Sequence, residues 1–234
     1  MPPKRIAFVV TCEHGGNAIP RRYRHLFHGQ AQLLSTHRAL DIGAFDLARS
    51  LARILHAPLF YSTTSRLVID LNRSLHHRRV FSEFTRSLTP SERELLISRY
   101  YRPYRARIED HIARRITAGA RVVHVSAHSF TPILDGRART TDIGLLYDPS
   151  RSFETRVCRA WQELLTAAAP ELRVRRNYPY RGTADGFTSY LRTRFPNKRY
   201  AGIELEVIQG LSLESAREWR ACRALLARTL AAAA

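Results

Sequence analysis

The stretch IAFVVTCEHGGNAIP, residues 6–20, contains an apolar, β-branched run that stops abruptly at polar residues and a glycine pair. The run over residues 6–11 has the length and composition of a buried strand, and Glu13, His14 and Asn17 follow at its carboxyl end. In α/β sheets, ligands bind at the carboxyl ends of the strands. The stretch therefore predicts a strand that delivers functional side chains. A phosphate loop is disfavoured, because GxxxxGK[ST] and its lysine are missing here.

The rest of the chain alternates between strand and helix patterns. Apolar residues recur every three or four positions from His37 to Leu55, which predicts an amphipathic helix, and TPSERELL at Thr89 has the signature of a helix N-terminus. Further predicted strands cover residues 58–61, 66–71, 121–129, 142–148 and 200–210. Further predicted helices cover residues 89–116 (one helix, or a pair broken near Pro103), 153–169, part of 183–195, and 213–233. This alternation predicts a three-layer α/β sandwich with a mixed, largely parallel central sheet, in one domain spanning residues 1–234.

Composition narrows the functional classes. The three cysteines are widely spaced and form no CxxC pair, which argues against a disulfide framework. No apolar stretch approaches the roughly 18 residues of a membrane span, and the N-terminal apolar run is too short for a secretory signal, so we expect a cytoplasmic protein without membrane contact. The net charge of +18 suggests nucleic-acid binding, but its arginines are spread along the whole chain, and the charge equally suits small anionic substrates.

Three predicted strand ends carry groups that support catalysis. His14 follows the first strand and His128 ends the strand at 121–129; with an oxygen donor they would form a three-ligand zinc site open to water. Ordinary hydrogen-bonded histidines are the alternative. In GIELEVI, Glu204 and Glu206 alternate with apolar residues and face one side. We expect Glu206 to be a general base that takes a proton from water and passes it to a leaving nitrogen, whereas a solvent-facing edge would equally explain Glu204.

The segment SRLVIDLNRS, residues 65–74, places Asn72 and Arg73 after a hydrophobic run. The planar fork of Arg73 suits a substrate carboxylate or a developing oxyanion. Arg66 is either a second anion-binding arginine or a surface residue at the start of a strand. As a lone motif DxNR is weak, because Asp and Asn are also common turn residues.

Eight blocks together resemble a known family. They are TCEHGGNAIP, HRALDIGAFDLA, RLVIDLNRS, YYRPYR, VSAHSFTP, DIGLLYD, NYPYRG and GIELEV. In this order, over nearly the whole chain, they resemble the N-formylglutamate amidohydrolase family. The resemblance implies a phosphorylase/hydrolase-like α/β fold, related to zinc carboxypeptidases and to the aspartoacylase and succinylglutamate desuccinylase group. It also implies hydrolysis of N-formyl-L-glutamate to formate and glutamate.

The resemblance assigns roles to individual residues. Those relatives hold zinc with a His-x-x-Glu pair and a distant histidine, which His14 and His128 match. Asn72 and Arg73 match the substrate-binding pair, and Glu206 matches the catalytic glutamate on a late strand.

The resemblance departs at Asn17, which stands where the zinc relatives have glutamate. An amide oxygen is a poorer zinc ligand than a carboxylate, so either Asn17 binds weakly, or Glu13 or Asp41 supplies the oxygen, or the site takes another divalent metal. We expect a zinc-dependent amidohydrolase acting on a small anionic N-acyl amino acid. The alternatives are an enzyme for another N-acyl amino acid or peptide, a family member that has lost activity, and a basic nucleic-acid-binding protein. The sequence does not indicate the oligomeric state.

Overall fold

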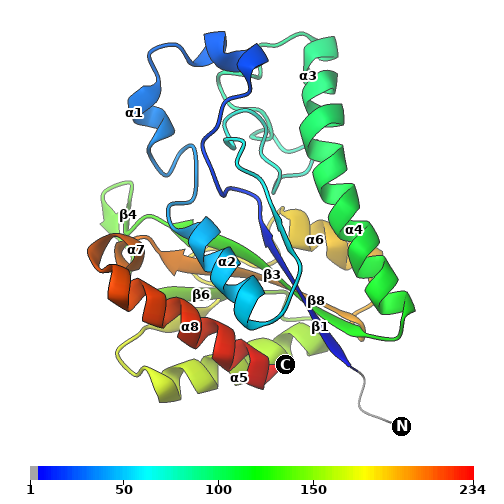
Figure 1. The fold of residues 1–234 in the computed structure, drawn as a ribbon, viewed down its shortest axis with the longest axis vertical. Coiled ribbons are helices and arrows are strands. Elements are labelled where there is room, and N and C mark those ends of the chain that lie inside the picture. Colours follow the sequence, from blue (N-terminus) through cyan, green and yellow to red (C-terminus); the bar gives the residue numbers. More distant parts are fainter. Residues whose placement is uncertain (1–4) are drawn as a thin grey trace.

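The computed structural model describes residues 5–234 and contains a mixed six-stranded sheet (Figure 1). Its strands are β1 (Ile6–Cys12), β2 (Leu59–Tyr61), β3 (Arg121–Phe130), β6 (Ile143–Leu146), β7 (Val174–Arg176) and β8 (Tyr200–Ile208). They lie in the order β2-β1-β3-β8-β6-β7. The first four are mutually parallel, and β6 runs antiparallel to β8 and parallel to β7. The predicted mixed, largely parallel sheet is therefore confirmed. β4 (Ile133–Leu134) and β5 (Arg137–Ala138) form a separate antiparallel pair.

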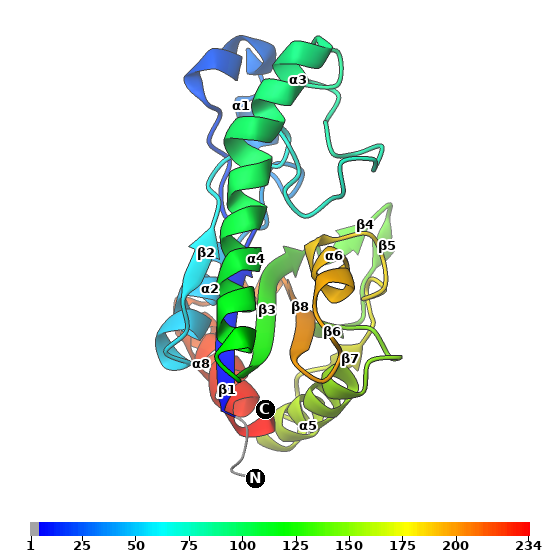
Figure 2. The ribbon, with the colours of Figure 1, turned by 90° about the vertical axis from the view of Figure 1, so that its right-hand side faces the viewer.

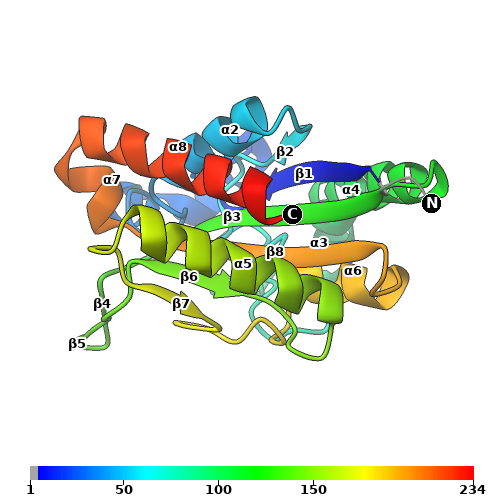
Figure 3. The same ribbon diagram turned by 90° about the horizontal axis from the view of Figure 1, so that it is seen from below.

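Helices cover both faces of the sheet and complete the predicted three layers. One layer consists of α2 (Ala44–Ile54), α5 (Ser152–Ala168) and α8 (Ala216–Ala233), with α5 and α8 side by side (Figure 3). The opposite layer consists of α4 (Arg102–Thr117) and α6 (Phe187–Arg194). Short helical segments are η1 (Arg21–Phe27), α1 (Ala31–Leu34) and α7 (Gly210–Glu214). Within residues 5–234, no helix is long and apolar enough to cross a membrane.

The alternation of β3 separates the core from the site. Val123, Val125 and Ala127 are buried in the core under α2, α5 and α8. The alternate positions, which point to the opposite face of a strand, are occupied by the buried polar residues His124, Ser126 and His128. The face toward α4 and α6 therefore becomes polar as β3 approaches its carboxyl end.

A long helix connects the sheet to an upper part of the molecule that contains η1, α1 and α3 (Figure 2). It begins as α3 (Pro90–Leu96), continues as the π-helical segment η2 (Ile97–Tyr101) and ends as α4. The predicted capping box is present, because Thr89 Oγ1 accepts from the Glu92 backbone N–H and Glu92 Oε2 accepts from the Thr89 N–H. The chain stays helical through Pro103, and the wider π turn lies just before this proline, where a regular hydrogen bond is lost.

Two predicted elements were wrong. Residues 66–71 form no strand: Val68 N–H bonds to Ser65 O in a turn, and the apolar side chains fill a second core in the upper part with residues such as Leu96. The apolar run reflects burial rather than sheet pairing. The helix predicted from His37 begins only at Ala44, because Gly43 has a left-handed φ of 81° that interrupts it.

Candidate active site

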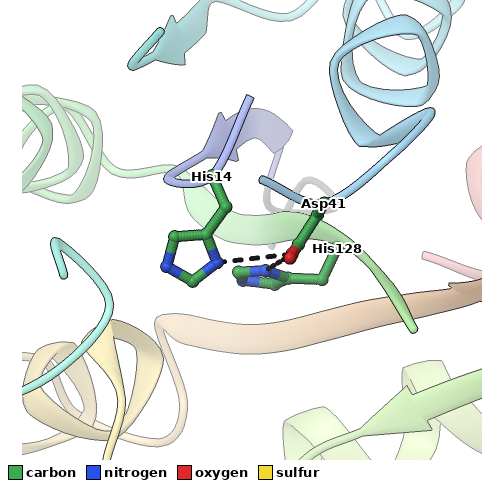
Figure 4. Close-up of side chains that lie close together, drawn as sticks. All are labelled: His14, Asp41 and His128. Carbon is green, nitrogen blue, oxygen red and sulfur yellow. Dashed lines mark hydrogen bonds and ion pairs between the residues drawn. The ribbon is translucent and has the colours of Figure 1, made fainter. Parts of the chain in front are cut away.

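His14, Asp41 and His128 converge at the carboxyl ends of β1 and β3 (Figure 4). Asp41 Oδ2 lies 2.8 Å from His128 Nδ1 and 3.3 Å from His14 Nδ1. All three side chains are buried, and one potential ligand atom from each lies within 4.8 Å of the others. Two imidazole nitrogens and one carboxylate oxygen form a donor set that suits zinc and leaves further coordination positions for water or substrate.

The backbone explains how Asp41 reaches the two histidines. Its N–H donates to His14 O at 3.0 Å, and its carbonyl accepts from Ala44 N–H at the start of α2. Ser129, the neighbour of His128, donates from Oγ to Ile42 O at 2.7 Å. The segment before α2 is therefore fixed to the ends of both strands that carry the histidines.

The structure does not bring Asn17 to this group, which corrects the expectation that it is the third metal ligand. Its side chain is exposed, and Nδ2 donates to Leu34 O at 2.7 Å. The chain turns away after Gly16, where a Cβ would lie only 2.6 Å from Thr63 O, and Ala18 pairs with the segment beyond β2. Asp41, one of the alternatives left open by the sequence, lies beside the two histidines instead.

Glu13, the other alternative, lies behind His128. Ser126 Oγ donates to Glu13 Oε2 at 2.6 Å and lies 2.8 Å from His128 Nε2, while Tyr104 donates to Glu13 Oε1 at 3.0 Å. Burial raises the pKa of Glu13, but its interactions with His128 and Ser126 outweigh this effect and lower the pKa to about 2. Because the serine proton points to Glu13, its oxygen accepts from His128 Nε2–H. With the Nε2 of His128 bonded to Ser126, its Nδ1 faces Asp41 and is the nitrogen that could bind a metal.

Asp70 has the corresponding position behind His14, with Oδ1 2.7 Å from Nε2 of the ring. Arg66 bridges the two aspartates, since Nη2 donates to Asp70 Oδ2 at 2.9 Å and Nη1 to Asp41 Oδ1 at 3.2 Å. The sequence showed Asp70 in DLNRS without indicating this role. A carboxylate behind the far nitrogen, direct for His14 and relayed through Ser126 for His128, is a usual way in which proteins orient metal-binding imidazoles.

The electrostatics of the group follow from these contacts. Burial lowers the pKa of each histidine, yet the neighbouring carboxylates raise the pKa of His14 and raise that of His128 well above its ordinary value. Burial raises the pKa of Asp41, but His14, His128 and Arg66 outweigh it and lower the pKa. The carboxylates therefore favour the protonated form of both imidazoles, and a metal would displace protons from the nitrogens facing Asp41.

Glu206 lies beside this group because it is the register partner of His128 across β3 and β8. Its side chain is buried, and Oε2 has no hydrogen-bond partner among the described residues. Burial, helped by Asp41 and Glu204, raises its pKa to about 8, against the opposing effect of His128. β8 lies inside the sheet, so the edge explanation for Glu204 was wrong, and Glu204 Oε1 accepts from Thr188 Oγ1.

A cavity of about 320 Å³ connects these residues with the predicted substrate pair. Asn72 and Arg73 both line it, as do Arg66, Arg79, Arg181 and Asp185. Asn72 Oδ1 accepts from Phe187 N–H at 2.8 Å, and Arg73 Nη1 donates to Asp185 O at 2.6 Å. Sequence reasoning missed Arg79, Arg181 and Asp185, because they come from loops whose fold no periodicity indicates.

The loop that carries this pair is held from the long helix. Arg105 donates from Nη1 to Leu71 O and to Arg73 O, each at 3.2 Å, and Tyr101 donates to Arg73 O at 2.7 Å. The Arg105 guanidinium is itself buried against aromatic rings, including Phe187. The backbone on either side of Asn72 is therefore fixed by a buried cation.

Comparison with known proteins identifies a family and a fold. The family model for N-formylglutamate amidohydrolase matches residues 6–213. The crystal structure of gene product Atu2144 from Agrobacterium tumefaciens is similar, with a TM-score of 0.83 and 31% sequence identity over 99% of this chain and 90% of that chain. N-formylglutamate amidohydrolase from Ralstonia eutropha JMP134 shares the fold, with a TM-score of 0.73 and 20% identity over 99% of this chain and 95% of that chain. The comparison with curated proteins gives no significant match. Because the family model covers most of its length, this chain belongs to the N-formylglutamate amidohydrolase family.

Proposed function

We propose that the protein is a metal-dependent amidohydrolase that hydrolyses N-formyl-L-glutamate to formate and glutamate. The observation that carries this proposal is the position of the buried Glu206 carboxylate, whose Oε2 is unpartnered among residues 5–234, beside the His14, Asp41 and His128 group in one cavity. Family membership supports the amide hydrolysis, and the arginines of the cavity support an anionic substrate.

The metal would be held by Nδ1 of His14, Nδ1 of His128 and a carboxylate oxygen of Asp41. We propose zinc because two imidazoles and one carboxylate suit it, and other divalent transition metals share these preferences. A bound zinc ion would supply Lewis acidity toward the acyl oxygen and toward water. Glu13 and Asp70 keep the two imidazole rings oriented from behind.

Glu206 acts as the proton carrier in this proposal. Its carboxylate takes a proton from the attacking water and gives it to the nitrogen that leaves as the amine of glutamate. Burial keeps this carboxyl group protonated at neutral pH in the metal-free protein. The ionised form of Glu206 is the base in this proposal, and positive charge beside it, whether on His128 or on a bound metal, favours that form.

Arg73 and Asn72 anchor the substrate in this proposal. The guanidinium of Arg73 offers parallel N–H groups to a carboxylate, and Asn72 lies beside it with its Oδ1 already used by the Phe187 N–H. Arg66 adds positive charge to the same wall, but both of its terminal nitrogens already donate to Asp41 and Asp70. We therefore give Arg66 the role of orienting a metal ligand ahead of contacting the substrate.

Metal content and formate release test the proposal together. The wild-type protein should contain about one zinc per chain by elemental analysis and release formate from N-formyl-L-glutamate. His128→Ala should lose both, whereas Glu206→Gln should keep the metal and lose about 10²–10⁴-fold in kcat. His25→Ala, an exposed histidine on η1, is the matched control and should behave as wild type. Equal rates for wild type and His128→Ala would exclude the metal mechanism. A panel of N-formyl amino acids in which acidic side chains give no advantage would remove the role of Arg73.

A further inference from the structure

A second cavity adjoins the one that contains Glu206. Its volume is about 460 Å³, compared with about 320 Å³ for the first. Arg66 and Arg79 line both cavities, so the two spaces are adjacent and share these arginines as a wall. The walls of the second cavity come from the segments 37–38, 66–70 and 78–86 in the upper part of the molecule.

This second cavity is strongly basic. Five of its eleven lining residues are arginines: Arg38, Arg66, Arg78, Arg79 and Arg86. Its two carboxylates are already paired, Glu83 with Arg38 and Asp70 with Arg66. Within residues 5–234, no carboxylate lies within salt-bridge distance of Arg78, Arg79 or Arg86. Three arginines therefore line a shared space without a carboxylate partner among the described residues.

Arginine is abundant in this protein, so exposed arginines alone do not indicate a site. A smaller cavity of about 240 Å³ near Arg49 and Arg53 is also basic, but none of its lining residues belongs to the candidate active site. The cavity at Arg78 and Arg86 differs because Arg66, which also bonds to Asp41, is part of its wall. The cavity is therefore next to the candidate active site, and a long ligand that passes Arg79 would reach it.

We propose that this cavity, lined by Arg78, Arg79 and Arg86, is a subsite for an additional carboxylate of the substrate. The preferred substrate would then be an N-acyl amino acid with a further acidic group, such as an N-formylated acidic dipeptide. Guanidinium groups bind carboxylates through paired, charge-assisted hydrogen bonds. Together the two cavities also have the volume of a site for a ligand larger than one amino acid. This inference rests on the proposed amidohydrolase function for its choice of substrate.

A binding measurement tests the subsite without requiring turnover. Calorimetric titration compares the affinities for L-glutamate and L-glutamyl-L-glutamate. These are the deacylated forms of N-formyl-L-glutamate and of N-formyl-L-glutamyl-L-glutamate. We expect about tenfold tighter binding of the dipeptide, the gain from one partly exposed charge-assisted contact. The double variant Arg78→Gln/Arg86→Gln should remove this gain, while the matched variant Arg49→Gln/Arg53→Gln should retain it. The subsite is overturned if the two ligands bind with equal affinity or if neither binds detectably. It is also overturned if Arg78→Gln/Arg86→Gln still binds the dipeptide about tenfold more tightly than L-glutamate.

Competition and turnover complete the test. Inorganic phosphate that abolishes the gain for the dipeptide supports a shared anion site, whereas phosphate bound alongside the dipeptide without competition overturns it. In the turnover assay, N-formyl-L-glutamyl-L-glutamate should have about tenfold higher kcat/KM than N-formyl-L-glutamate. A protein that binds the dipeptide preferentially but hydrolyses neither substrate would contradict the proposed function and leave the subsite intact. A protein that hydrolyses both equally and binds both products equally would support the function and overturn the subsite.

Discussion

Glu206→Gln should change how the stability of the metal-free protein depends on pH. Glu206 is buried, and burial together with the nearby Asp41 and Glu204 outweighs the positive charge of His128, so that its pKa is about 8 instead of the ordinary 4.5. Glutamine has nearly the same shape but does not titrate. The substitution therefore isolates the free energy of ionising this one buried group.

The sign follows from proton linkage. Between pH 4.5 and 8, the folded protein keeps a proton on Glu206 that the unfolded chain has released, so the stability of the wild type falls as pH rises through this window. Each pH unit corresponds to about 1.4 kcal/mol, so the shift from 4.5 to about 8 amounts to at most about 5 kcal/mol. The unfolding free energy of Glu206→Gln should lack this fall. Its advantage over the wild type should be smallest near pH 5 and several kcal/mol larger at pH 9.

Urea unfolding of chelator-treated protein at pH 5, 7 and 9 measures the difference in unfolding free energy between Glu206→Gln and the wild type. Glu204→Gln is the matched control, because it makes the same chemical replacement on the same face of β8, at a side chain whose Oε1 accepts a hydrogen bond from Thr188. The effect specific to Glu206 is the difference in unfolding free energy between the Glu206→Gln and Glu204→Gln variants at each pH. If this difference in unfolding free energy stays constant from pH 5 to 9, the assignment of Glu206 as a carboxyl group that burial keeps protonated is refuted.

Three further predictions concern the metal site and the loop beside it. Glu13→Gln should lower zinc affinity about 10–100-fold in a chelator competition, because it weakens the support behind His128, and an unchanged affinity would contradict that support. Asn17→Ala should bind zinc as tightly as the wild type while Asp41→Ala loses stoichiometric binding; the reverse result would restore Asn17 as a ligand. Gly16→Ala should cost about 1–3 kcal/mol in the unfolding free energy, because its Cβ would lie 2.6 Å from a backbone carbonyl oxygen, and thermal unfolding with no loss of stability would show that the loop yields freely.

The sequence predicted the sheet because burial leaves a strong periodic signal. The apolar run of β1 and the alternation in β8 belong to strands packed on both sides, and the structure confirms both. The same signal failed at residues 66–71, where the run is buried in a second core without pairing to a strand. A hydrophobic run indicates that a segment is buried, but whether its backbone pairs in a sheet depends on the segments that pack next to it.

Part of the site was predictable for a related reason. His14, His128 and Glu206 lie at or near the carboxyl ends of neighbouring parallel strands, so topology alone brings them together. The register that sets Glu206 opposite His128 is a property of two strands more than 70 residues apart in the chain, and no local pattern encodes it.

The residue that we propose as the third ligand was harder to predict, because a short spacing in sequence does not place two side chains together. Asn17 is only three residues from His14, but the two side chains would lie on the same face only if the backbone between them were helical. The glycine pair instead allows the chain to run close against the segment beyond β2, and it carries Asn17 to the surface. Asp41 is far away in sequence, yet its N–H bonds to the carbonyl of His14. Its position also depends on Gly43, whose left-handed conformation delays the start of α2. Asp41 reaches the histidines through these tertiary contacts, so no local sequence pattern marks it as a candidate ligand.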